Sequence, residues 1–147
     1  MQNDPVILAL QEQLTCYKRL AKLAEIQHEH VQNSQTDKLL EVLGRRQEVL
    51  EQVGRLEQVI GPMKRTWSDY LTTLGTVQRS SAESLLKQTR QLLEQITSAD
   101  RNDAIVLQQR KMNLGRQIQK NTMARSVNRK YAASAYGPRQ SKMDIQQ

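Results

Sequence analysis

The feature that most constrains this chain is a row of apolar residues that recurs at alternating steps of three and four. The row starts just after Asp4-Pro5 and comprises Ile7, Leu10, Leu14, Tyr17, Ala21, Ala24, His28 and Val31. Such steps place side chains along one face of an α-helix, as in heptad-repeat bundles. Val6, Leu20 and Leu23 widen the stripe, so we expect a bundle helix that ends near residue 33. Asp4 is its expected N-cap, with Pro5 at the first helical position.

A second helix is expected after a polar turn. Residues 33–37, Asn-Ser-Gln-Thr-Asp, are rich in capping residues. The next row has heptad spacing again and comprises Leu39, Val42, Arg46, Val49, Val53, Leu56 and Ile60. A short turn between two long amphipathic helices predicts an antiparallel hairpin. Gly61-Pro62 is expected to end the second helix, because the residue before a proline avoids helical geometry.

The rest of the chain predicts one short and one long helical segment. Residues 62–79 favour a short helix, and Gly75 with Ser80-Ser81 then indicates a break. Ser80 and Glu83 form a capping box for a last helix that is expected to reach about Tyr131. Residues 97–103 are the weakest part of this helix, and a kink there is compatible with the pattern.

Composition agrees with a helical fold. The chain has 147 residues with no Phe, one Trp and three Pro, and it is rich in straight-chain residues that favour helices. We therefore expect an all-α protein: an antiparallel bundle or coiled coil of three long helices, with a short connecting helical segment. Residues 1–132 are expected to form one domain, and residues 133–147 a flexible basic tail.

Positive charge is concentrated toward the C-terminus. Residues 1–109 hold 13 Lys and Arg against 14 Asp and Glu, whereas residues 110–147 hold nine against one. Such a segment attracts acidic surfaces. Three interpretations are open: a solvated basic face, an acidic protein partner, or nucleic acid. Nucleic acid is the least favoured, because Tyr131 and Tyr136 are the only aromatic residues there for base stacking.

The sequence offers little for catalysis or metal binding. His28 and His30 are the only histidines, and two residues apart they point to different faces of a helix. His28 falls on the apolar row, where a packed or capped side chain is expected. Cys16 is the only cysteine and is expected to be buried. Glycine-rich phosphate loops are missing from the sequence. We expect no enzyme activity, cofactor, metal or small-molecule substrate.

The first residues lack a secretory signal, and no apolar run approaches the length of a membrane span. A cytoplasmic protein without membrane insertion is therefore expected.

The order of these features resembles the FlgN family of bacterial flagellar export chaperones. The resemblance covers nearly the whole chain in pattern, and the motifs that carry it are Leu43…Arg46…Val49-Leu50…Val53…Leu56-Glu57, Ala135-Tyr136-Gly137 and Lys142-Met143-Asp144-Ile145. It implies a chaperone that binds the C-terminal helical segments of hook-associated proteins, prevents their premature assembly and delivers them to the type III export gate. The resemblance also implies docking on the cytoplasmic domain of the gate through Tyr136, with Tyr131 as second candidate.

A client helix would lie along an apolar groove and contact residues at helical spacing. The last helix is the best candidate for that groove, because the first two helices can cover each other. The expected client contacts are Leu85, Leu92, Leu93, Ile96, Val106, Leu107, Leu114 and Ile118. The alternative for each is a place in the core of the bundle.

Two other functions stay open. One is a self-associating coiled-coil scaffold or adaptor without an export client, which predicts a homo-oligomer. The other is a nucleic-acid binder whose affinity falls steeply with salt. A homodimer is also compatible with the chaperone hypothesis.

Overall fold

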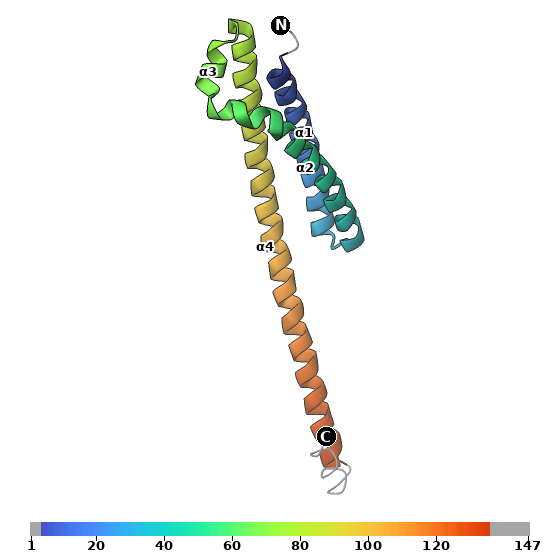
Figure 1. Ribbon diagram of the computed structural model, residues 1–147. Helices are drawn as coiled ribbons and strands as arrows, with labels where there is room; N and C mark the ends of the chain where they lie inside the picture. Colours follow the sequence, from blue (N-terminus) through green and yellow to red (C-terminus); the bar gives the residue numbers. More distant parts are fainter. Residues whose placement is uncertain (1–3, 136–147) are drawn as a thin grey trace. The chain divides into compact units, whose positions relative to one another are not determined.

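The computed structural model describes residues 4–135 of the chain, with side chains to residue 132, and every element in that range is a helix. The helices are α1 (Pro5–Gln32), α2 (Thr36–Arg65), α3 (Trp67–Thr72) and α4 (Thr76–Ala135) (Figure 1). The expected all-α class is confirmed, and long helices pack together. The chain divides into two compact units, Met1–Ala104 and Ile105–Gln147, and the boundary lies within α4. Residues 136–147 of the expected tail, including Tyr136, lie outside the described residues.

Helix α1 begins as predicted. Oδ1 of Asp4 accepts hydrogen bonds from the backbone N–H groups of Val6 (2.9 Å) and Ile7 (3.2 Å), and Pro5 is the first helical residue. The same carboxylate oxygen accepts a bond of 2.9 Å from the Tyr70 hydroxyl. Asp4 therefore caps α1 and also ties α3 to it. Burial, together with this bond and the charge of Asp4, raises the pKa of Tyr70 above its usual value.

A tight turn joins α1 to α2. Ser34 has a φ of 54°, which is the left-handed region, and the Gln35 N–H bonds to the carbonyl of His30 at 2.9 Å. Gln13, early in α1, donates to Glu57, late in α2, at 3.3 Å. The two helices therefore run in opposite directions.

Two predicted helix boundaries are wrong. Helix α2 does not end at Gly61-Pro62 but continues to Arg65 with Pro62 inside it. Pro62 has no backbone N–H, so the helix lacks one hydrogen bond there. Ile60 is fully buried and Met63 packs against the core, and this packing outweighs the loss.

Helix α4 starts at Thr76, not at a capping box on Ser80, and residues 97–103 are helical throughout. The carbonyl of Gly75 accepts the N–H of Arg79 at 2.8 Å, which brings the first turn forward. Ala82, two residues after Ser80, is fully buried and holds this turn against the core.

The core of the first unit joins all four helices. Its buried cluster comprises Val6, Ile7, Ala9, Leu10, Ile60, Tyr70, Leu74 and Ala82. Trp67 packs beside Tyr70 with ring centroids 5.4 Å apart. Cys16 is buried as expected, and burial raises the pKa of its thiol. Aliphatic side chains supply most of this core, in keeping with the low aromatic content.

Helix α4 buries one residue in seven along its first half. The buried row comprises Ala82, Thr89, Ile96 and Asp103. A row at steps of seven is the signature of a heptad contact. Two of its four members are polar, which hides this row from a search for apolar residues alone.

Candidate functional site

The predicted client contacts divide between the two units. In the first unit, Ile96 is buried, Leu85 and Leu92 are half-buried, and Leu93 is exposed. Leu85 packs against the core cluster. Most of the apolar surface of these four residues is thus already used within the fold.

The predicted contacts of the second unit are mostly exposed. Leu107, Leu114 and Ile118 have 41%, 59% and 58% of their surface exposed, and Val106 is half-buried. At 3.6 residues per turn, Leu107, Leu114 and Ile118 lie on one side of the helix. We call these three residues the client face. Large apolar side chains grouped in solvent mark interaction surfaces.

Several other apolar residues of the second unit are exposed but were not among the predicted contacts. They are Ile105, Met112, Met123 and Val127. The spacing of four between Met123, Val127 and Tyr131 was the signal that could have found them. Tyr131, the second candidate for gate docking, is also well exposed.

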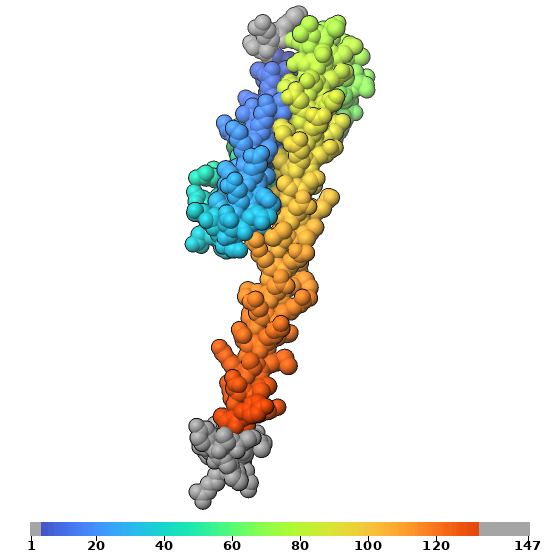
Figure 2. Space-filling view, turned by 180° about the vertical axis from the view of Figure 1, so that it is seen from behind, coloured from blue at the N-terminus to red at the C-terminus, as the bar shows by residue number. Residues whose placement is uncertain are grey.

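Charge in this part of α4 has one sign. Residues 105–132 contain no Asp or Glu, and their basic residues are Arg110, Lys111, Arg116, Lys120, Arg125, Arg129 and Lys130. Figure 2 shows this orange-to-red segment with its side chains projecting separately. The surface therefore combines exposed apolar groups with basic side chains, and residues 105–132 contribute no acidic side chain to it.

A groove of about 570 Å³ lies between α1 and the first part of α4. Figure 2 shows these two stretches, blue and yellow, side by side. Small and polar residues line the groove: Ala21, Ala24, Glu25, His28, Glu29, Gln95, Ile96, Ala99 and Asn102. Of the predicted client contacts, only Ile96 lies in it.

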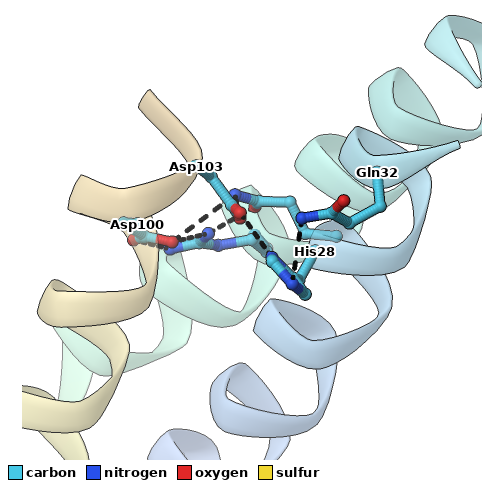
Figure 3. Close-up of polar contacts among 6 residues, drawn as sticks. His28, Gln32, Asp100 and Asp103 are labelled. Atoms are coloured by element: carbon cyan, nitrogen blue, oxygen red, sulfur yellow. Dashed lines mark hydrogen bonds and ion pairs between the residues drawn. The ribbon is translucent and has the colours of Figure 1, made fainter. Parts of the chain in front are cut away.

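A polar cluster at the end of the first unit joins three helices (Figure 3). Arg46 of α2 donates two bonds to Asp100 of α4, at 2.7 Å and 2.6 Å, and a third to Gln27 of α1. Asp103, only 2% exposed, lies 2.8 Å from Nδ1 of His28 and accepts from Gln27 at 3.1 Å. We call these five residues the polar clasp.

The clasp fixes where α4 meets the hairpin. The hydrogen bond to Asp100 raises the pKa of Arg46, and the charges of Asp100 and Asp103 add to this, whereas burial opposes it. An Arg–carboxylate pair with two parallel hydrogen bonds has a defined geometry. The pair therefore both attracts α4 to α2 and specifies the register between the two helices.

The apolar rows placed His28 and Arg46 among apolar neighbours, and the structure places both in the polar clasp. His28 has 52% of its side chain exposed, so it forms the edge of the cluster. The signal in the sequence was Arg46 itself, a charged residue at a heptad position. Asp100 and Asp103 lie in the stretch of the last helix that the apolar pattern described as weak.

Within residues 4–135, no group of three or more His, Cys, Asp or Glu residues is placed to hold a metal ion. None of the helices there is long and apolar enough to cross a membrane. No protein-family model matches the chain, and searches of curated proteins and solved structures found no significant match.

Proposed function

We propose that this protein is a cytoplasmic export chaperone of the bacterial flagellum. It would bind C-terminal helical segments of hook-associated proteins, prevent their premature assembly and deliver them to the type III export gate. The FlgN-like order of sequence features motivates the proposal. The observation that carries it is the client face, whose three large side chains are 41–59% exposed within residues 105–132, a stretch of α4 without acidic residues.

The exposed area is large enough to matter for binding. Full burial of a Leu or Ile side chain contributes roughly 1.5–3 kcal/mol, so covering the exposed half of three such residues contributes about 3 kcal/mol. That corresponds to roughly a hundredfold in affinity. A helical client segment with apolar residues at steps of three and four matches such a face.

The proposal assigns the two units different tasks. An antiparallel bundle of α1, α2 and the first part of α4 would be the stable frame, held by the aliphatic core and the polar clasp. Residues 105–132 would take the client, and Tyr136 or Tyr131 would dock on the export gate. The proposal involves no catalysis, cofactor or small-molecule substrate.

A binding assay with purified hook-associated protein tests the proposal. The double variant L114A/I118A is expected to bind at least about tenfold more weakly, because it removes most of the client face. The matched control is L40A/V77A, which removes two exposed apolar side chains of the first unit. Equal binding by both variants would reject the client face.

The gate-docking part has a separate test. With Tyr136 as the docking residue, a chain that ends at Ala132, and so keeps Tyr131, should retain the hook-associated protein and lose the export-gate component in a pull-down from a flagellated bacterium. Loss of both partners, or retention of both, would contradict the assignment of docking to the tail.

A self-associating scaffold without a client is the second candidate. The observation that favours it is an exposed apolar row on α2, formed by Leu40, Leu43 and Leu50. Light scattering distinguishes the two functions: a scaffold is a stable oligomer that L43A/L50A dissociates. The chaperone is expected to be a monomer or weak dimer that this variant leaves unchanged.

A further inference from the structure

A second exposed face lies on the same helix as the client face. It is formed by Met112, Arg116, Lys120, Met123 and Val127, at steps of four, four, three and four. Such steps keep side chains on one side of a helix. The three apolar members are 51%, 69% and 48% exposed, and the two basic members are exposed as well. We call these residues the mixed face.

The mixed face is separate from the client face. At 3.6 residues per turn, the two faces point about 180° apart around the helix axis. The two faces can therefore be occupied at the same time.

The order of side chains on the mixed face specifies its partner. Two cations, one helical turn apart, lie between apolar groups on both sides. A helix laid along this face needs apolar residues near each end and two carboxylates between them. Arg116 can hold a carboxylate with two parallel bonds, and Lys120 one turn later can hold the next. The face is about 22 Å long, or roughly four turns of a partner helix.

Other occupants fit this face less well. A second copy of residues 105–132 would bring seven more cations and no anions, and like charges repel. Nucleic acid would pair with Arg116 and Lys120 but leave Met112, Met123 and Val127 in water. A helix lying on a membrane needs one continuous apolar face, whereas this helix has apolar groups on opposite sides.

We infer that the mixed face binds an α-helix of another protein that presents two acidic residues between apolar ones. This site is distinct from the client face and does not depend on the proposed chaperone function. It gives residues 105–132 two docking surfaces with different chemistry.

A designed peptide tests the inference with the full chain. The probe is a labelled helical peptide with Leu at positions 1, 12 and 16 and Glu at positions 5 and 9, so that it mirrors the mixed face. A control peptide carries Lys in place of both Glu residues. Fluorescence anisotropy should show that the Glu peptide binds and that the Lys peptide binds about tenfold or more weakly. Added salt should reduce the affinity for the Glu peptide.

Charge reversal distinguishes recognition from general stickiness. The variant R116E/K120E is expected to lose the Glu peptide and to bind the Lys peptide instead. L114A/I118A, on the opposite side, should bind the Glu peptide within about twofold of the unchanged protein. Because all these residues are exposed, the substitutions leave the core untouched, and circular dichroism checks this.

Three results would overturn the inference. One is no preference for the Glu peptide over the Lys peptide. Another is unchanged specificity after charge reversal. The third is tighter binding of duplex DNA or of anionic phosphatidylglycerol vesicles, lost in R116E/K120E, which would reassign the face to nucleic acid or lipid.

Discussion

Two stretches of helix α4 have apolar residues at helical spacing and differ in how those residues are covered. Before residue 105, the row of Ala82, Thr89, Ile96 and Asp103 is buried within the first unit. After it, Leu107, Leu114 and Ile118 are exposed, and residues 105–132 contain basic residues but no acidic ones. The first stretch contributes to a core, whereas the second presents a surface. Helical periodicity alone does not distinguish the two roles, because both show it.

The largest expected difference between the stretches is in stability. Leu10 is fully buried in the core that α4 helps to form, so Leu10→Ala should lower the free energy of unfolding by about 3 kcal/mol. Leu114→Ala, in the exposed stretch, should change it by less than about 0.5 kcal/mol. Urea denaturation measures both. Similar losses for the two variants would show that Leu114 is part of a core.

Disruption of the polar clasp is expected to cause the next largest loss in the free energy of unfolding. Arg46→Ala removes the guanidinium that donates to Asp100 and to Oε1 of Gln27. The loss should cost about 2 kcal/mol, less than for a fully buried pair because Asp100 is partly exposed. Arg45→Ala is the matched control, since its pair with Glu41 is exposed and contributes under about 0.5 kcal/mol. Equal effects in urea denaturation would show that the clasp adds no stability.

The sequence predicted local features better than those that depend on packing. The cap at Asp4-Pro5 follows from short-range chemistry, and the burial of Cys16 was expected from the apolar helical pattern around it; both were predicted correctly. The helix boundaries predicted at Pro62 and Ser80 were wrong, because the burial of Ile60 and Ala82 outweighs local preferences there. A search for apolar heptads also missed Asp103, a buried acid whose place depends on Gln27 and His28 of another helix.

Dependence on packing also explains why the candidate surface was predicted only in part. Leu107, Leu114 and Ile118 were predicted as contacts together with Leu85 and Ile96, since all share helical spacing. Their exposure separates the two groups, and exposure depends on which residues of the rest of the chain reach them. The cations of residues 105–132 were visible in the sequence, but the mixed face was not recognised.

Alkaline pH should weaken the link between α1 and α3. The folded-state pKa of Tyr70 is raised, so folding favours the protonated phenol. This contribution is fully present below the unfolded pKa of about 10 and is lost as the pH rises through the folded value. Tyr70→Phe should therefore reduce the fall in stability above about pH 10. Tyr131→Phe, at an exposed site, is the control, and a similar effect of both variants would contradict the explanation.

The smallest expected effect concerns Thr89. Its hydroxyl is buried, with no hydrogen-bond partner among the residues that the structure describes. Thr89→Val keeps the shape and removes the unsatisfied polar group, so stability should rise by about 1 kcal/mol. Thermal and urea denaturation measure the gain. A loss of stability would mean that the hydroxyl is satisfied in solution.

Hydrogen exchange measured by mass spectrometry tests the central claim most directly, on the protein alone and with a purified C-terminal segment of a hook-associated protein. In the free protein, amides of residues 76–104 should exchange more slowly than those of residues 105–132, because packing covers only the first stretch. With the segment bound, new protection should be concentrated in residues 105–132. Protection confined to residues 76–104, or none in either stretch, would contradict a client surface on the second half of α4.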